Sequence, residues 1–558
     1  MKRCSDSSPR LLGARRYSRV SAIAALSLLC LFGFGAQRAH TQSGTTPASV
    51  PELRVEPWSV AAVASADIDS SRFDRARVAL LQLATAAPEH PATLFLLGKL
   101  RFHEGNYDDA VDALRGAAAA APNTRAIASL LALAESTQQV VDDYDVFTTQ
   151  DGLFEIRYDA SRDAVLIPWA AETLEAAYYE IGYDLGYWPE PPIRVEIHPR
   201  ASTLARVSSL TEEAIETSGT IALCKYNKLM FTSPRATLRG YGWRTTLAHE
   251  YVHYVIEHKV QASLPIWFHE AAAKYLEGRW TGDRDMVMPP SREELLSQRI
   301  EAEDLITFDQ MHPSMAYLPS PEDASTAYAQ VFTVVEYLID RRGPMVLRSL
   351  LERVHDGDDI IAAIEGELEE PFDVFEQNWL RYLVARPRVD IPGQFTDEVQ
   401  LLAEDADDEN SDAFAGIDSP DAQEFLRLGE LLRARGFVAG AVEEYQKAEL
   451  LLGRANPLLQ NAMARANLDL ARAQVALTAL EEVVNWFPSF YQSHLHRGEA
   501  LNALGEHEAA IVALELAGGI NPFDPAVHQQ LAIAWDALGN GANAEHYRHN
   551  ATRVAGGT

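Results

Sequence analysis

The sequence predicts an α+β central domain with all-α helical segments on both sides, and three observations lead to this prediction. Small residues recur at a fixed interval near both ends of the chain, which is typical of stacked helix pairs. Between them, short apolar runs bounded by prolines come first and helical apolar spacing follows. A strand-rich part followed by a helix-rich part indicates an α+β domain.

The composition is that of a folded, strongly acidic protein. The chain has 558 residues, of which 47% are hydrophobic and 23% are charged, and its formal net charge is −32. This length predicts several cores rather than one. Because such a surface repels phosphate backbones, nucleic acid is not expected as a partner.

The first residues read as a targeting segment, predicted to be a signal peptide over 1–39. Basic side chains precede an apolar run at 20–36, and small residues including Ala39 follow it. We therefore expect an extracytoplasmic location, periplasmic or secreted, with no stable membrane span after cleavage. An uncleaved N-terminal anchor is the alternative. Cleavage would take the net charge from −32 to about −38 and leave Cys224 alone of the 3 cysteines, so no internal disulfide is expected.

Near the carboxy terminus, a set of small and large apolar residues repeats every 34 residues, with one 35-residue step. The copies are Gly429, Ala441, Tyr445 and Ala448; Ala464, Ala476, Leu480 and Val483; Gly498, Ala510, Leu514 and Ala517; and a degenerate Ala532 and Ala544. Small residues let two helices approach closely where they cross. This pattern resembles the tetratricopeptide (TPR) repeat, which implies a helical solenoid that binds a protein partner.

The same template fits the amino-terminal half twice, at Gly98, Ala110, Leu114 and Ala117, and one period earlier at Ala76, Leu80 and Leu83. An acidic segment punctuated by proline and glycine separates the central part from the carboxy-terminal repeats and reads as a linker. The predicted domains are the signal peptide (1–39), N-terminal TPR-like repeats (57–135), a central domain (140–389), the acidic linker (390–420) and C-terminal TPR repeats (421–558).

Within the central domain, strands are predicted at 153–159 and 192–199, with one or two more at 220–234. A helix is predicted over 165–186 between the first two strands. Further helices are expected from Thr245 onward, over 265–278 between Pro265 and Gly278, and from Tyr328 onward.

The stretch "TTLAHEYVHYVIEH" contains two histidines in a helical pattern. His249 and His253 are four residues apart and share one helix face, so each can offer a ring nitrogen to one ion. Glu250 is rotated about 100° from His249 and can reach a water on that ion without binding the metal. This arrangement suits a carboxylate that takes a proton from the water.

A catalytic tetrahedral zinc site needs a third protein ligand. A histidine six residues after His253 is excluded, because Lys259 occupies that position. The remaining option is a glutamate from the next helix, and "PIWFHEAAAKYLEG" supplies Glu270. The sequence therefore predicts one Zn²⁺ per chain, bound by His249, His253 and Glu270.

These two segments together resemble the gluzincin metallopeptidases, and are closest to the peptidase-MA-like proteins that often carry TPR repeats. The family pattern places a tryptophan before the ligand glutamate, then a small residue and an aromatic, positions filled here by Trp267, Ala273 and Tyr275. One departure is Ala271, where the family usually has glycine. The resemblance covers roughly residues 151–383 and implies a gluzincin-like fold between the solenoid segments.

The resemblance also implies a tyrosine that hydrogen-bonds the developing oxyanion, and "AYAQVFTVVEYLIDRRG" places it at Tyr328. Packing on a helix face is the alternative role for Tyr328. The segment "SGTIALCKYNKLMF" lacks the glutamate with which the related aminopeptidases grip a free amine. We therefore expect an endopeptidase whose protein or peptide substrate pairs with that strand.

Other residues near the site receive structural interpretations. His258 and His269 are predicted to point away from the metal, and Glu277 to be either close behind a ligand or on the surface. Cys224 is predicted to be an inert thiol in a strand, and Trp267 to pack beneath the second helix.

Two hypotheses for function follow. The first is an exported zinc-dependent metallopeptidase in which Glu250 activates the water, Tyr328 assists and the repeats recruit protein. The second is a non-catalytic extracytoplasmic TPR scaffold with a relic peptidase domain. The sequence favours the first, because a scaffold does not need Glu250 between the two histidines.

Overall fold

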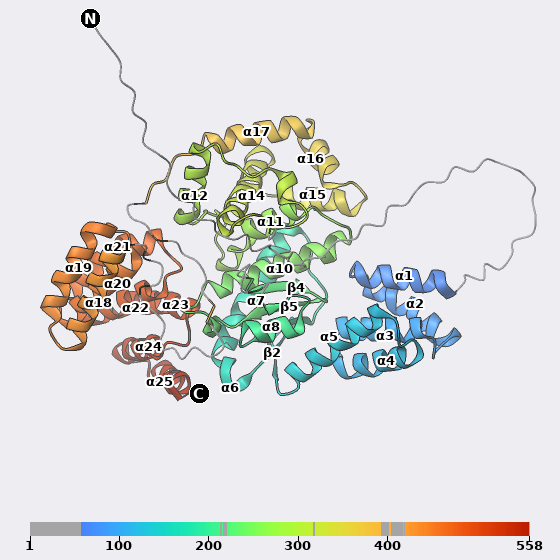
Figure 1. Cartoon of the computed structure of the whole chain (residues 1–558), viewed down its shortest axis with the longest axis horizontal. Helices are drawn as coiled ribbons and strands as arrows, with labels where there is room; N and C mark the ends of the chain where they lie inside the picture. The colour runs from blue at the N-terminus through green and yellow to red at the C-terminus, as the bar shows by residue number, and fades with distance from the viewer. Residues whose placement is uncertain are drawn as a thin grey trace, which may run out of the picture.

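The structure is a computed structural model that describes residues 57–556, apart from 213–214, 216–219, 316–317, 392–394, 396–400, 403–413, 415–416 and 418. The predicted signal peptide lies outside the described residues, as does most of the predicted linker. The predicted architecture is confirmed: an α+β domain lies between two helical arrays (Figure 1). No described helix is both long enough and apolar enough to cross a membrane.

The amino-terminal array consists of antiparallel helices that pack in sequence order. Gly98 shows why small residues recur here, since a Cβ at this position would lie 2.6 Å from Cγ of Leu114 on the next helix. Ala76 and Ala110 are fully buried at the equivalent crossings, as the repeat pattern predicts. The helices are α1 (Pro57–Asp69), α2 (Phe73–Ala86), α3 (Pro91–His103), α4 (Tyr107–Ala120) and α5 (Arg125–Val141).

The central domain begins with a five-stranded sheet in the order β1-β2-β3-β5-β4. Strands β2, β3 and β5 run parallel to one another, whereas β1 and β4 are antiparallel additions at the two edges. The strands predicted from sequence are present, and the 220–234 segment forms a hairpin of two strands. The strands are β1 (Asp145–Thr148), β2 (Phe154–Tyr158), β3 (Ile193–His198), β4 (Ala222–Lys225) and β5 (Lys228–Thr232).

The strand connections are mostly helical. The longest connecting helix, α7, packs its apolar stripe on the sheet and ends at Gly186 in the left-handed conformation. The connecting elements are α6 (Ala160–Asp163), the 3₁₀ turn η1 (Ala164–Leu166), α7 (Ile167–Leu185), α8 (Ala201–Val207) and the 3₁₀ turn η2 (Pro234–Ala236).

The second half of the central domain is helical and stacks above the sheet in Figure 1. Helix α10 lies between the sheet and the rest of this layer, because it contacts α7, β4 and β5 on one side and α11 and α15 on the other. The elements are α10 (Trp243–Val260), α11 (Ile266–Leu276), the 3₁₀ turn η3 (Arg279–Thr281), α12 (Pro290–Glu301), α13 (Phe308–Met311), α14 (Pro321–Arg342), α15 (Val346–His355), α16 (Ile360–Leu368) and α17 (Phe372–Val384).

The carboxy-terminal array repeats the helix-pair design. The residues that recur in the sequence are the buried ones: Ala441, Ala476, Ala510 and Ala544 are each fully buried at a helix crossing. The helices are α18 (Pro420–Ala434), α19 (Val438–Leu452), α20 (Pro457–Asp469), α21 (Ala473–Trp486), α22 (Tyr491–Leu504), α23 (His507–Ile520), α24 (Pro525–Ala537) and α25 (Gly541–Gly556).

The amino-terminal array docks on the sheet through a buried polar cluster. The Tyr107 hydroxyl donates to the Glu196 carboxylate, and Lys228 Nζ donates to Tyr107 at 2.8 Å and to Glu196 at 2.7 Å. All three side chains are at most 5% exposed. A second contact joins this array to α10: Nη1 of Arg72, the residue before α2, donates to the backbone oxygen of Gln261, the residue after α10. The array is thereby joined to both the sheet and α10.

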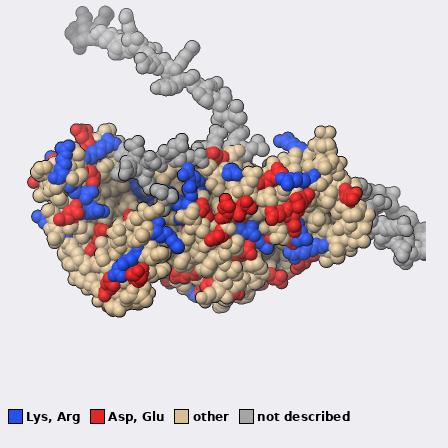
Figure 2. Space-filling view, turned by 90° about the horizontal axis from the view of Figure 1, so that it is seen from below, with Lys and Arg blue, Asp and Glu red and all other residues tan. Residues whose placement is uncertain are grey.

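The carboxy-terminal array contacts the central domain at the opposite end of α10. The Trp169 ring stacks on His528 with ring centroids 6.1 Å apart. Gly240, in the loop before α10, has φ +70°, and a Cβ there would lie 2.6 Å from the Ile520 oxygen. Figure 2 shows acidic side chains gathered in the middle of one face, with basic side chains among them.

Candidate metal centre

One face of helix α10 is apolar and packs against the sheet. Trp243 at its first position is fully buried and stacks on Phe231 of β5, with centroids 6.0 Å apart. Leu247, Tyr251 and Val255 continue this buried stripe at helical spacing. The opposite face therefore carries His249 and His253 toward α11.

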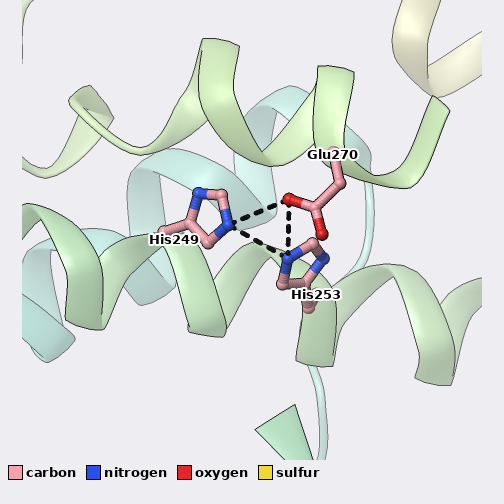
Figure 3. Close-up of side chains that lie close together, drawn as sticks. All are labelled: His249, His253 and Glu270. Atoms are coloured by element: carbon pink, nitrogen blue, oxygen red, sulfur yellow. Dashed lines mark hydrogen bonds and ion pairs between the residues drawn. The ribbon is translucent and has the colours of Figure 1, made fainter. Parts of the chain in front are cut away.

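Helix α11 returns across α10 and brings the Glu270 carboxylate to face both imidazoles, as Figure 3 shows. The Nε2 atoms of His249 and His253 are 3.1 Å apart. Oε2 of Glu270 lies 3.3 Å from Nε2 of His249 and 3.6 Å from Nε2 of His253. The three residues predicted as metal ligands are therefore brought together, with one ligand atom of each within 4.8 Å of the others.

These separations fit a tetrahedral metal ion. Ligand atoms at zinc bond lengths of about 2.0–2.1 Å would lie about 3.3 Å from one another. Oε2 of Glu270 is buried and forms no well-aligned hydrogen bond, and its polar neighbours are the two Nε2 atoms themselves, so a cation bound among the three atoms would satisfy it. Two imidazole nitrogens and one carboxylate oxygen are also the ligand set of catalytic zinc sites with an open position.

Glu277 holds the other nitrogen of His249. Nδ1 of His249 lies 2.8 Å from Oε2 of Glu277, and Lys274 Nζ donates to the same carboxylate oxygen at 2.9 Å. A carboxylate at Nδ1 keeps the proton there, so Nε2 presents its lone pair to the site. Burial lowers the pKa of His249, but the facing carboxylates of Glu270 and Glu277 outweigh it and raise that pKa to about 9, so a metal ion that binds Nε2 has to displace the proton there. The sequence had left Glu277 as either a residue behind a ligand or a surface charge.

His269 holds the other nitrogen of His253, so the prediction that His269 points away from the site is wrong. The two Nδ1 atoms are 2.5 Å apart, and the ring centroids are 4.6 Å apart. Burial is the main cause that lowers the pKa of His269 to about 3, so this ring is neutral and can accept a hydrogen bond. The prediction assumed that His269, about 100° around the helix from Glu270, would point away from the metal ligands. Helix α11 crosses so close to α10 that the His269 side chain still reaches His253.

Glu250 lies beside the ligand group without joining it. Glu250 is only 8% exposed, and the backbone N–H of Cys224 on β4 donates to its carboxylate. Burial raises the pKa of Glu250, and the neighbouring His253 and His249 oppose this rise without cancelling it. A carboxylate with a raised pKa is a better proton acceptor, as a general base requires.

Tyr328 on α14 also lies near these residues. The negative charge of Glu270 is the largest cause that raises its pKa well above the ordinary value, followed by burial and by Glu250 and Glu277. Lys274 Nζ lies 5.4 Å from the centre of the Tyr328 ring. The phenol therefore stays protonated and can donate a hydrogen bond.

The remaining predicted residues have structural partners. His258 faces away from the ligands, with its ring nitrogens 2.8 Å from the Tyr254 oxygen and 3.0 Å from Oδ1 of Asn227. Trp267 is 5% exposed and stacks on Phe308 at 4.3 Å, as predicted. Cys224 lies in β4 as expected and is half-buried.

Comparison with known families agrees with this architecture. Residues 175–385 match the model of the Peptidase MA superfamily, and residues 67–134 and 461–525 match tetratricopeptide repeat models. The chain therefore carries a Peptidase MA superfamily domain flanked by TPR repeats. No curated protein matches the chain.

Solved structures similar to this chain include a TPR protein and MamA. A thermophilic TPR protein of Thermus thermophilus is 26% identical, with 24% of this chain and 74% of that chain covered at a TM-score of 0.23. MamA from Desulfovibrio magneticus is 20% identical, with 24% of this chain and 76% of that chain covered at a TM-score of 0.23.

Proposed function

We propose that this chain is an exported zinc-dependent metallopeptidase, acting as an endopeptidase on protein or peptide substrates. The observation that supports this proposal most directly is the arrangement around α10. Three ligand atoms lie within 4.8 Å of one another, and the buried Glu250 carboxylate stands next to them without contributing a ligand. A purely structural metal site is usually closed by a fourth protein ligand, and the described residues supply three.

The chain's own residues divide the chemistry among them. A zinc ion bound by His249, His253 and Glu270 supplies a Lewis acid that polarises a carbonyl and lowers the pKa of water. Glu250 accepts a proton from the attacking water and passes it to the nitrogen of the departing amine. Because its pKa is raised by burial, Glu250 holds that proton well enough to make both transfers.

Tyr328 takes the second role in this proposal. Its phenol remains protonated beside three carboxylates, so it can donate a hydrogen bond to the oxygen on which negative charge develops. That charge exists only in the transition state, so the interaction accelerates the chemical step rather than substrate binding.

The edge of the sheet offers a place for the substrate. Strand β4 is the last in the order and, among the described strands, pairs with β5 alone. Its Cys224 amide reaches Glu250, which places the strand directly beside the proposed base. An extended peptide that pairs with β4 would pass over the metal site with its backbone held by main-chain hydrogen bonds.

Two further parts of the proposal rest on sequence and fold. The basic and apolar amino-terminal segment supports export to an extracytoplasmic compartment. The TPR arrays support recruitment of a protein, as substrate or partner, because stacked helix pairs form extended binding surfaces.

The test pairs metal analysis with hydrolysis. Purified wild-type protein and the Glu250→Gln variant are analysed for zinc and incubated with a casein-like mixture, with Glu89→Gln as the control. Glu89 is an exposed carboxylate in the loop before α3. We expect equal zinc in all three proteins and loss of at least about 10²-fold in hydrolysis for Glu250→Gln only.

The alternative function makes different predictions in the same experiment. An extracytoplasmic TPR scaffold with a relic peptidase domain would lack zinc, or would show no difference between the wild type and Glu250→Gln. Zinc with equal cleavage by both proteins would also contradict the role proposed for Glu250.

A further inference from the structure

One carboxylate on the ligand face of α10 has no role in the chemistry described above. Glu257 lies four residues after His253, as His253 lies four after His249, so the three side chains follow one row along the helix. Glu257 is therefore the next residue of this row beyond the metal ligands.

The Glu257 carboxylate has no partner among the described residues. No hydrogen bond or ion pair with another described side chain engages it, although the residue is only half-buried and remains accessible. Burial raises its pKa to about 7, and of the neighbouring charges His253 and Lys225 lower it while Glu250 raises it. A carboxylate in this state gains when a cation binds beside it.

The nearby lysine is engaged elsewhere. Lys225 at the end of β4 donates from Nζ to Ser209 Oγ at 2.7 Å, and its ammonium lies 5.2 Å from the centre of the Tyr226 ring. Its side chain is thus held by groups outside α10. Lys225 lies close enough to lower the pKa of Glu257, yet it forms no ion pair with that carboxylate among the described residues.

The direction of β4 shows which part of a substrate would meet Glu257. Cys224 contacts Glu250, and Asn227, just past the end of β4, lies 3.0 Å from the His258 ring. Strand β4 therefore runs in the same direction as α10. A peptide pairing antiparallel to β4, the more stable arrangement, would place its amino-terminal residues at the Glu257 end.

We propose that Glu257 binds a cationic group of the substrate on the amino-terminal side of the bond to be cleaved. This inference rests on the proposed peptidase function and names a specificity determinant for it. The cation has two sources: a lysine or arginine side chain, or the free α-amino group of a short substrate. Both satisfy the same unpaired carboxylate by a charge-assisted hydrogen bond.

The second source bears on how the enzyme would cut. The strand segment lacks the acidic residue with which related aminopeptidases grip an amine, but Glu257 offers a carboxylate from α10 instead. A requirement for a free amino terminus would make the enzyme an exopeptidase. A preference for a basic side chain would leave it an endopeptidase.

The test compares three peptides that differ in one charge. The first is acetylated and neutral, the second is acetylated with a lysine scanned across the amino-terminal positions, and the third is neutral with a free amino terminus. The ratio of kcat/KM for each cationic peptide to that for the neutral one is measured with zinc-loaded wild type, Glu257→Gln, Glu257→Lys and Glu89→Gln.

We expect one of the cationic peptides to be preferred by about 10- to 100-fold in the wild type and in Glu89→Gln. The lysine peptide identifies a side-chain subsite, and the free-amine peptide identifies an amino-terminal subsite. Glu257→Gln should bring the ratio close to one, and Glu257→Lys should bring it below one. An unchanged ratio in both Glu257 variants overturns the assignment.

Binding separates failure of this inference from failure of the proposed hydrolysis. Fluorescently labelled versions of the same peptides are titrated against zinc-loaded Glu250→Gln, with and without Glu257→Gln. Selective binding of a cationic peptide that depends on Glu257, without any cleavage by the wild type, supports the subsite and contradicts the peptidase. Absence of selective binding contradicts the subsite whether or not the wild type cleaves.

Discussion

Nδ1 of His249 lies 2.8 Å from Oε2 of Glu277, so a carboxylate seven residues beyond Glu270 orients the first imidazole of the site. The two residues come from different helices, because Glu277 is the C-cap of α11 and His249 lies within α10. The pair therefore ties the position of one proposed ligand to the end of the helix that supplies another.

Replacing Glu277 by Gln should weaken zinc binding by about 10- to 100-fold, because the amide cannot hold the Nδ1 proton as a carboxylate does. The measurement is competition with a chromophoric chelator. Lys274→Gln is the matched control, since it changes the charge beside Glu277 without touching His249, and we expect a smaller loss. Equal affinity of Glu277→Gln and the wild type would show that the contact is structural.

His269 should have a comparable effect through the other imidazole. His269→Leu keeps the packing volume but removes the acceptor for His253, so we expect zinc affinity to fall by about tenfold or more. His269→Asn places an amide oxygen near the position of Nδ1 and should restore most of it. If the leucine variant binds zinc as tightly as the wild type, the ring serves only to pack.

Tyr328→Phe tests the phenol separately from the metal. Removing one donor to the developing oxyanion should lower kcat by about 10²-fold while zinc content and KM stay close to the wild-type values. Steady-state kinetics on a peptide cleaved by the wild type would measure this. A change in KM alone would assign Tyr328 to substrate binding.

Asp163 predicts a dependence of stability on pH that is independent of the metal. Burial raises its pKa to about 7, against the opposing effects of the Ser233 hydrogen bond, 2.7 Å long, and of Arg235. Since the folded state holds this proton more tightly than the unfolded state, its contribution is complete below about pH 4 and is lost as pH rises to about 7.

The free energy of unfolding of Asp163→Asn, relative to that of the wild type, should therefore rise by about 2–3 kcal/mol when the pH is raised from about 5 to about 8. Denaturant unfolding of both proteins in excess chelator at the two pH values measures the difference. Any cost of the asparagine that does not depend on pH cancels in this comparison. A difference that stays constant with pH would show that Asp163 is ionised in the folded state.

Local patterns account for most of what could be predicted from the sequence. The spacing of His249 and His253 is set by one helix, and the repeat positions are set by helix pairs, so neither needs distant information. Strand β1 was not predicted, because three of its four residues are exposed and it has no apolar alternation. Its place in the sheet depends on pairing with β2.

Contacts between distant segments could not be predicted in the same way. The cluster of Tyr107, Glu196 and Lys228 joins residues up to 121 positions apart, and none carries a local signal of its partners. His269 and Glu277 belong to the same class, since their contacts depend on how closely α11 crosses α10. The sequence gives no signal for a role of Glu257, because a glutamate near the end of a helix is common.

The hydrogen bond from Arg72 to the backbone oxygen of Gln261 ties the amino-terminal array to one end of α10, while the carboxy-terminal array meets the loop before its other end. The amino-terminal array is thereby joined to the far end of the helix that carries both imidazoles, so a truncation that removes the array also removes this support from α10. The truncation would expose the buried Lys228, which contacts Tyr107 of the array, and would remove the Arg72 contact at the end of α10. A protein that binds and displaces α2 would therefore also displace the carboxy-terminal end of α10.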